Sequence, residues 1–276
     1  MTRLLTPEDA LSRVPGFERH TYLFEISGGL TNRSFIVHSG GGRYVLRLDA
    51  EHTTAFGLDR STELRILRNA AEASLAPEIR YADPATGILV YDYLPGPVWD
   101  RASLDDGDNL ARVAALLRKV HGLPTSGVSL DALGAALRYE AMASRHPELS
   151  LHAARCVEII RTTPAPPVTC CCHNDVVASN IVGNTQLRLL DWEYACDNDP
   201  YFDLASLIAY HDLGRKHADR LLDSYTGDRS PQAQERLELQ LRRYDAIQWL
   251  WFAARYVIDQ NSEHRARLEQ LRQRTR

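Results

Sequence analysis

Two polar segments near the middle of the chain hold residue types that could carry out phosphate chemistry. HNDVVASN covers residues 173–180, and LLDWEYA covers residues 189–195. Asp175 and Asn180 lie in a polar turn, and Asp191 directly follows the apolar run LRLL. Two carboxylates and an amide oxygen are hard ligands that suit Mg²⁺. The pattern indicates a metal-assisted phosphoryl transfer, although such a turn can also be purely structural, with local hydrogen bonds to Asp and Asn.

Three adjacent cysteines lie directly before the first segment and suggest a metal site as an alternative. Cys170, Cys171 and Cys172 follow an apolar stretch, so we expect a short buried strand. Neighbouring side chains on a strand point to opposite faces, and three successive thiols therefore cannot converge on one tetrahedral ion. Buried thiols behave as small hydrophobic groups. We interpret the cysteines as strand filler.

Composition limits the class of protein. The chain has 276 residues, 44% of them hydrophobic and 25% charged, with a net charge of −4. This charge argues against a nucleic-acid binder, and no apolar run is long enough for membrane insertion. The N-terminus shows no signal-peptide pattern, and five cysteines form a poor disulfide framework. We expect a cytoplasmic protein, whose oligomeric state the sequence leaves open.

The order of expected elements indicates an α+β fold with two domains. Residues 21–49 read as strands with Gly-rich turns, residues 58–74 as a helix that Ser61 can cap, and residues 79–94 as a hairpin. A breaker-rich segment at 94–97 follows, and the chain then becomes mainly helical. The predicted domains are residues 1–93 and 94–276.

These segments resemble the choline/ethanolamine kinase branch of the aminoglycoside phosphotransferase-like kinases, over roughly residues 20–255. The resemblance rests on HNDVVASN, LLDWEYA and DPYFDLA, and upstream on ISGGLTNRSFIV, YVLRL and VYDYLPG. The spacing from Asp175 to Asn180 also equals that of the kinase loop H-R-D-x-x-x-x-N. The resemblance implies a bilobal protein-kinase-like fold. Its N-lobe is a small antiparallel sheet with one helix that binds nucleotide, and its C-lobe is larger and mainly helical.

The resemblance also implies ATP and Mg²⁺ as cofactors and gives roles to individual residues. Asp175 would orient or accept the proton of the substrate hydroxyl, while Asn180 and Asp191 would hold Mg²⁺. His173 would order the loop, and Asp203 would brace it. The expected nucleotide-binding residues are Ser27, Gly28, Gly29, Leu30, Thr31 and Asn32 over the phosphates, Arg47 with its partner Glu63, and Tyr91, Asp92 and Tyr93 along the adenine. Whether ATP or GTP is the donor stays open.

The acceptor is expected to be a small cationic alcohol. An aromatic wall on a late helix would hold the cation by cation–π attraction, and the candidate contacts are Glu193, Tyr194, Trp249, Trp251 and Phe252. The same aromatic stripe is equally typical of core packing, and its W-x-W spacing departs from the W-x-x-W of the family.

Several alternatives remain for the activity. Choline or ethanolamine ranks first as acceptor and thiamine second. Aminoglycosides rank third because their kinases usually show HGD where this chain has HND. A nucleotide-binding pseudokinase and a metal-binding regulator built on the Cys/His cluster are the non-enzyme alternatives.

Overall fold

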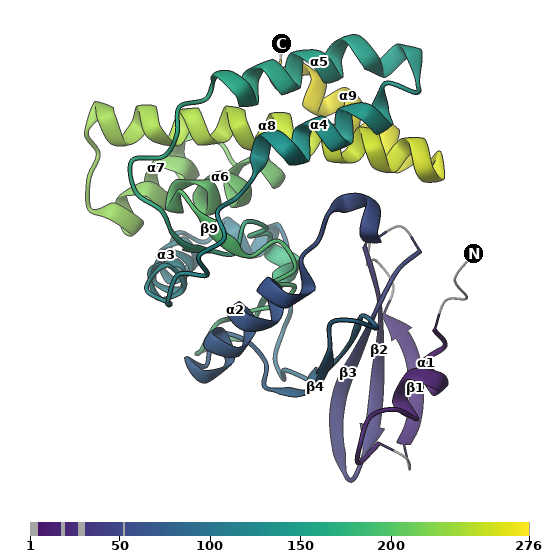
Figure 1. Cartoon of the computed structure of the whole chain (residues 1–276). Helices are drawn as coiled ribbons and strands as arrows, with labels where there is room; N and C mark the ends of the chain where they lie inside the picture. Colours follow the sequence, from purple (N-terminus) through teal and green to yellow (C-terminus); the bar gives the residue numbers. More distant parts are fainter. Residues whose placement is uncertain (1–4, 18–19, 27–30, 52, 276) are drawn as a thin grey trace. The chain divides into compact units, whose positions relative to one another are not determined.

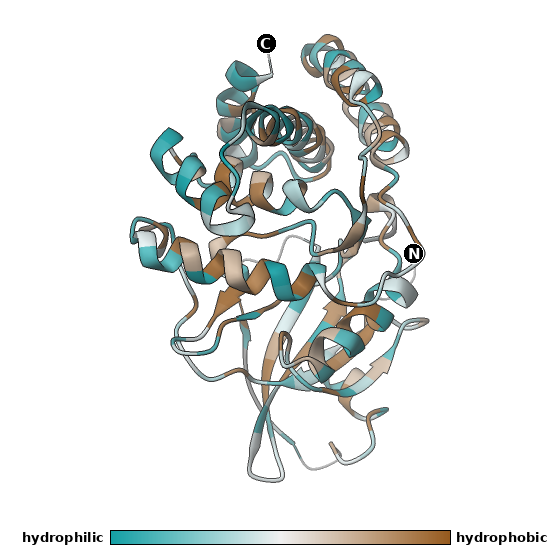
Figure 2. Cartoon of the chain, turned by 90° about the vertical axis from the view of Figure 1, so that its left-hand side faces the viewer, coloured by the Kyte–Doolittle hydropathy of each residue, from teal (hydrophilic) through white to brown (hydrophobic). Residues whose placement is uncertain are grey.

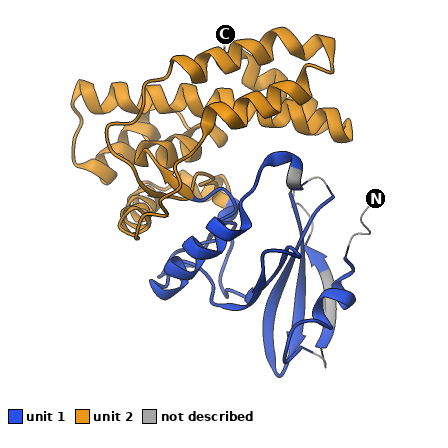
Figure 3. Cartoon of the chain, in the orientation of Figure 1, with its two compact units in different colours: residues 1–99, 179–195 blue, residues 100–178, 196–276 orange. Residues whose placement is uncertain are grey.

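The chain folds into two compact units (Figure 3). Unit 1 contains residues 1–99 and 179–195, and unit 2 contains residues 100–178 and 196–276. The sequence predicted a single division between residues 93 and 94. The chain instead divides at residue 99, and residues 179–195 return to unit 1. The computed structural model describes residues 5–17, 20–26, 31–51 and 53–275.

Unit 1 is built on a five-stranded antiparallel sheet with strand order β1-β2-β3-β5-β4. Strands β1 to β4 are labelled in Figure 1. The alternating segments and glycine turns predicted these strands, and both expected hairpins are confirmed. The elements of this unit are α1 (Pro7–Leu11), β1 (His20–Ile26), β2 (Asn32–Ser39), β3 (Gly42–Asp49), a 3₁₀ turn (Thr53–Phe56), α2 (Arg60–Glu72), β4 (Ile79–Asp83), β5 (Ile88–Asp92), β7 (Ile181–Val182) and β8 (Arg188–Leu189).

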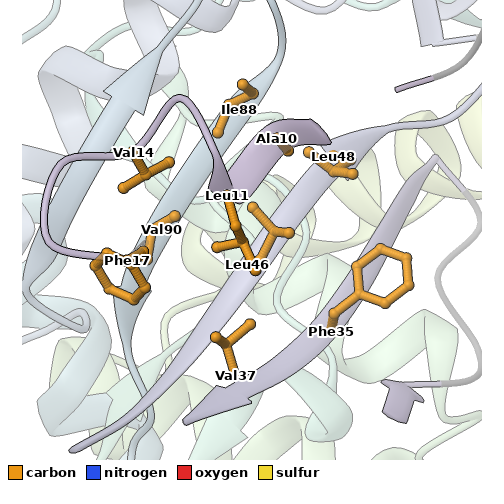
Figure 4. Close-up of a cluster of buried hydrophobic side chains, with 10 residues drawn as sticks. All are labelled: Ala10, Leu11, Val14, Phe17, Phe35, Val37, Leu46, Leu48, Ile88 and Val90. Carbon is orange, nitrogen blue, oxygen red and sulfur yellow. The ribbon is translucent and has the colours of Figure 1, made fainter. Parts of the chain in front are cut away.

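The first helix and the turn after it cover one face of this sheet (Figure 4). Thr6 caps α1 by accepting a hydrogen bond from the Asp9 N–H over 3.1 Å. Apolar side chains of the helix and turn then pack onto inward-facing side chains of β2, β3 and β5. The cluster consists of Ala10, Leu11, Val14, Phe17, Phe35, Val37, Leu46, Leu48, Ile88 and Val90.

Helix α2 has its N-cap two residues before the expected one. Asp59 is the N-cap, and its Oδ1 accepts the N–H groups of Ser61 at 3.0 Å and Thr62 at 3.1 Å. The expectation that Ser61 caps the helix is therefore wrong, because Ser61 supplies one of the N–H groups that need a cap.

The β7–β8 hairpin belongs to unit 1 because its backbone is hydrogen-bonded there. Leu189 N–H donates to the Leu75 carbonyl over 2.8 Å, and Trp99 N–H donates to the Ile181 carbonyl over 2.9 Å. The turn requires glycine at position 183, where φ is +115° and an added Cβ would lie 2.2 Å from the Gln186 carbonyl oxygen. Asn180 and Asp191, which flank this hairpin, therefore belong to unit 1.

Unit 2 is mainly helical, with the 29-residue helix α8 at its centre and α4, α5, α6 and α9 packed against it. Hydrophobic and hydrophilic residues both occur along several of the helices drawn in Figure 2, whereas residues 201–209 of α6 are all buried. Among the described residues, no helix has the length and apolar character that a membrane crossing requires. The elements are a 3₁₀ turn (Ala102–Leu104), α3 (Gly107–His121), α4 (Ala132–Ala143), α5 (Pro147–Thr162), β6 (Cys170–Cys172), β9 (Cys196–Asn198), α6 (Pro200–Tyr210), α7 (Arg215–Thr226), α8 (Pro231–Asp259) and α9 (Ser262–Arg274).

Candidate functional site

The loop that carries Asp175 is fixed by one buried carboxylate of unit 2. Asp203, on the first turn of α6, is 0% exposed. Its Oδ2 accepts the backbone N–H of His173 over 2.9 Å, and its Oδ1 accepts that of Asn174 over 2.7 Å. Asn174 has a φ of +64°, which is strained for a residue other than glycine. Asp203 therefore braces the loop, as the sequence predicted.

Two histidines complete the support of this loop. His173 is fully buried, and its Nδ1 accepts the N–H of Asp175 over 3.3 Å. His211 Nε2 accepts the N–H of Ala178 over 2.8 Å. Burial lowers the pKa of His211 to about 4, so its ring is neutral near pH 7 and can accept this hydrogen bond. The backbone on both sides of Asp175 is thus held in place.

Two tyrosines lie within the electrostatic reach of Asp175. Tyr210 ends α6, and Tyr244 lies buried on α8. Burial, and after it the negative charge of Asp175, raises the pKa of both phenols. Both therefore stay protonated near neutral pH. The sequence pattern did not single out Tyr210, because nothing in the helix spacing shows which aromatic residue approaches the loop.

The two expected Mg²⁺ ligands lie together in unit 1, at the open end of the β7–β8 hairpin. Leu190 N–H donates to the Asn180 carbonyl over 2.8 Å, which continues the hairpin ladder towards Asp191. Asp191 has a φ of +61°, and its side chain is 39% exposed. A carboxylate and an amide oxygen at the ends of two adjacent strands form a hard donor set that fits Mg²⁺.

Arg47 lies close to Asp191 and is held by Glu63. Its Nη2 donates to Glu63 Oε2 over 2.8 Å, and its Nη1 donates to Oε1 of the same carboxylate. The Nη1 atom is also 3.8 Å from Asp191 Oδ1. Burial alone would raise the pKa of Glu63, but the charges and hydrogen bonds of Arg47 and Arg60 hold it below its usual value. The predicted Arg47–Glu63 pair is present.

Glu193 is bound inside unit 1. It is 5% exposed, and its Oε2 accepts Asn32 Nδ2 over 2.6 Å and Arg60 Nη1 over 3.2 Å. Its Oε1 accepts the hydroxyl of Thr31. The expectation that Glu193 contacts the acceptor is not favoured by this geometry, because both oxygens already have partners. Sequence analysis missed Arg60, since one arginine at a helix start carries no distinguishing signal.

The expected phosphate turn is described only in part. Ser27, Gly28, Gly29 and Leu30 lie outside the described residues. Thr31 and Asn32 are buried, with exposed fractions of 5% and 6%, and both face Glu193. Their side chains therefore connect β2 to the segment that carries Asp191.

Part of the segment that was expected to bind adenine is hydrogen-bonded to neighbouring backbone of unit 1. Asp92 N–H donates to the Glu78 carbonyl over 2.9 Å, and Tyr93 N–H donates to the Arg43 carbonyl over 3.1 Å. The Arg43 guanidinium also lies 4.3 Å from the centroid of the Tyr93 ring. These two N–H groups therefore cannot donate to an adenine edge without leaving the sheet. Tyr91 is half-buried, and its expected contact stays a prediction.

Two of the expected acceptor-binding aromatics lie in the helical core. Trp249 is 1% exposed, and its ring meets His152 of α5 edge-on with centroids 4.6 Å apart. Phe252 is 8% exposed and faces His264 of α9, with centroids 5.6 Å apart. A cation wall made of these two rings is therefore not supported. Trp251 is half-buried, and its ring meets that of Phe252 edge-on with centroids 5.0 Å apart. Its acceptor contact stays a prediction, as does that of half-buried Tyr194.

Comparison with known proteins identifies the family. Residues 24–242 match the phosphotransferase enzyme family. The chain belongs to this family. Protein LicA of Haemophilus influenzae is 25% identical over 264 residues, covering 89% of this chain and 76% of LicA. The thiamine kinase of Salmonella typhi is 31% identical over 225 residues, covering 80% of this chain and 76% of that enzyme.

A solved structure shows the same fold. The crystal structure of choline kinase LicA from Streptococcus pneumoniae superposes with a TM-score of 0.75 at 19% sequence identity, covering 92% of this chain and 93% of that one. The expected α+β kinase-like fold is confirmed. The family and its relatives identify this phosphotransferase as a small-molecule kinase.

Proposed function

We propose that this phosphotransferase moves the γ-phosphoryl group of ATP, in the presence of Mg²⁺, to the hydroxyl group of choline or ethanolamine. The observation that carries the proposal is the arrangement around Arg47, which is fixed by Glu63 and lies 3.8 Å from Asp191. A buried guanidinium beside an exposed carboxylate combines the two charges that a metal-bound phosphate requires. The similarity to two proteins named LicA, one of them described as a choline kinase, supports the acceptor.

Asn180 and Asp191 would hold the Mg²⁺ ion. Their amide and carboxylate oxygens are the ligand types that Mg²⁺ prefers. When bound, the ion would offset the negative charge of the phosphate oxygens. Arg47 would bind a phosphate oxygen, because Glu63 keeps its planar guanidinium in one orientation.

Asp175 would act as the base that orients the acceptor. Its carboxylate would accept the proton of the hydroxyl group as the oxygen forms a bond to the γ-phosphorus, while the bond from that phosphorus to the bridging oxygen breaks. The buried Asp203 would keep the loop in position during this step. Asp175 thus touches the reacting atoms, and Asp203 acts through the backbone.

Thiamine is the second candidate acceptor. The Salmonella typhi thiamine kinase shares 31% identity, a higher value than that of Haemophilus influenzae LicA. Thiamine is also a cation with a primary hydroxyl group, so the same chemistry would serve it. Aminoglycosides rank third because the loop reads HND instead of HGD.

The test measures acceptor-dependent ADP release with Mg²⁺ and ATP for choline, ethanolamine, thiamine and kanamycin, with mass spectrometry of each product. We expect choline or ethanolamine to give the highest kcat/KM, with the other acceptors at least about tenfold lower. If thiamine gives the highest kcat/KM, thiamine replaces choline or ethanolamine as the proposed acceptor. ATP use that no acceptor stimulates would contradict the proposal. Replacing ATP by GTP in the same assay identifies the donor.

A further inference from the structure

Two of the three adjacent cysteines converge with a histidine from another element of unit 2. The expected strand is present as β6, and Cys171 is buried. Because side chains alternate along a strand, Cys170 and Cys172 share the opposite face. Their Sγ atoms are 3.8 Å apart. A ring nitrogen of His121, the last residue of α3, lies within 4.8 Å of both.

The distances fit a tetrahedral metal ion. With Zn–S bonds of about 2.3 Å, two thiolates on a tetrahedral Zn²⁺ lie about 3.8 Å apart, and with a Zn–N bond of about 2.0 Å a sulfur and an imidazole nitrogen lie about 3.5 Å apart. The two sulfurs already have this separation. The histidine nitrogen, which lies within 4.8 Å of both sulfurs, has to approach by at most about 1.3 Å.

The hydrogen bonds of His121 prepare one nitrogen for a metal. Its Nε2 lies 3.0 Å from Asp203 Oδ2, so Nε2 carries the proton and donates it to this carboxylate. Its Nδ1 then offers a lone pair, which now accepts the hydroxyl of Tyr225 over 2.6 Å. A histidine oriented by a carboxylate on its other nitrogen is the usual partner of protein-bound zinc.

We propose that Cys170, Cys172 and His121 form a three-ligand site for a borderline soft divalent cation such as Zn²⁺, with a water molecule as fourth ligand. Binding forms two S–metal bonds and one N–metal bond, releases the two thiol protons to solvent and breaks the Tyr225 hydrogen bond to Nδ1. Thiolate and imidazole ligands distinguish this site from Asn180 and Asp191, whose oxygen atoms suit Mg²⁺.

The site has an entry side and a connection to the loop of Asp175. Cys170 is half-buried, whereas Cys172 is fully buried and the His121 side chain is 6% exposed. An ion therefore enters past Cys170. Asp203, which orients His121, also accepts the N–H groups of His173 and Asn174. Because the three ligands come together only in the folded protein, a bound ion would stabilise the folded state of unit 2.

The test is titration of the reduced, metal-free full-length protein with Co²⁺, followed by absorbance, because thiolate-to-cobalt charge transfer gives a near-ultraviolet band that oxygen ligands do not produce. We expect one equivalent of Co²⁺ to produce the band, excess Mg²⁺ to leave it unchanged and Zn²⁺ to remove it by displacement. A wild-type protein that gives no such band would overturn the proposal.

Variants identify the ligands. Cys170→Ser and Cys172→Ser should each weaken Co²⁺ binding at least about tenfold. The matched controls Cys171→Ala and Cys156→Ala remove buried thiols outside the cluster and should bind as the wild type does. A band that survives in Cys170→Ser, or is lost in Cys156→Ala, contradicts the assigned ligands.

Thermal unfolding gives a second readout. Saturating Zn²⁺ should raise the Tm of the wild type by a few degrees and leave that of Cys170→Ser unchanged, because a ligand stabilises the state that binds it. The experiment stays decisive if Cys172→Ser folds poorly, since Cys170 is the more exposed thiol. An equal rise in Tm for both proteins would place the ion elsewhere.

Discussion

The side-chain amide of Asn32 donates to the carboxylate of Glu193 over 2.6 Å and so connects the start of β2 to the loop after Asp191. Arg60 adds a second contact, with Nη1 at 3.2 Å from Glu193 and Nη2 at 2.7 Å from Asn32 Oδ1. The segment with the expected Mg²⁺ ligand is thereby fixed to the sheet of unit 1. Glu193 is a positioning residue in this arrangement.

Glu193→Gln separates this role from the acceptor contact that the sequence suggested. We expect the KM for ATP to rise several-fold and the KM for the acceptor to stay unchanged, because the partners of Glu193 all lie in unit 1. The free energy of unfolding should fall by about 1–3 kcal/mol, the cost of leaving a buried partner unsatisfied. Initial-rate kinetics and urea unfolding measure both. A rise confined to the acceptor KM would restore the acceptor contact.

Arg47→Lys tests the fixed guanidinium. Lysine keeps the charge but cannot donate two parallel hydrogen bonds to Glu63. We expect kcat/KM for ATP to fall roughly 10- to 100-fold, with a smaller change in acceptor KM. Arg215→Lys is the control, because Arg215 pairs with Asp219 at a solvent-exposed site away from the expected nucleotide residues. Equal activities of Arg47→Lys and wild type would show that the two parallel hydrogen bonds to Glu63 are dispensable.

Asp203→Asn probes the support of the catalytic loop. The N–H groups of His173 and Asn174 donate to different oxygens of Asp203, so in the Asn variant one of them faces an amide NH2 group that cannot accept it. We expect kcat to fall at least about tenfold, while both KM values change little, since Asp203 orients the loop without touching substrate. Steady-state kinetics test this split. A loss that appears only as a higher KM would argue against a positioning role.

Stability should depend on pH through His211. Its pKa is about 4 in the folded protein and about 6.5 when unfolded, so between these values only the unfolded state takes up the proton. The contribution of His211 to stability is present above pH 6.5 and is lost as the pH falls towards 4. Urea unfolding of the wild type and of His211→Gln at a series of pH values measures this.

Glutamine keeps an acceptor for the Ala178 N–H and does not titrate, so His211→Gln should lose less stability on acidification than the wild type. Identical pH profiles for the two proteins would rule out His211 as the titrating group.

Local patterns predicted the sheet of unit 1 well. Strand alternation and glycine turns gave both hairpins, and the family resemblance anticipated the pair of Arg47 and Glu63. The observed β7–β8 hairpin brings Asn180 and Asp191 together, because strand register is a short-range property.

Long-range partners were not predictable from these patterns. The position of Trp249 depends on which side of α8 packs against α5, and a helix with buried residues on several sides shows no clear apolar stripe. Cys170 and Cys172 meet His121 only because α3 and β6 pack together in unit 2. Such contacts are set by tertiary packing rather than by spacing along the chain.

The central claim is that Asp175 serves as the base of phosphoryl transfer. The most direct measurement is single-turnover transfer from ATP to the preferred acceptor by Asp175→Asn, with ATP binding measured separately. We expect the transfer rate to fall about 10²- to 10⁴-fold while ATP affinity stays unchanged. Transfer at the wild-type rate by this variant would contradict the account.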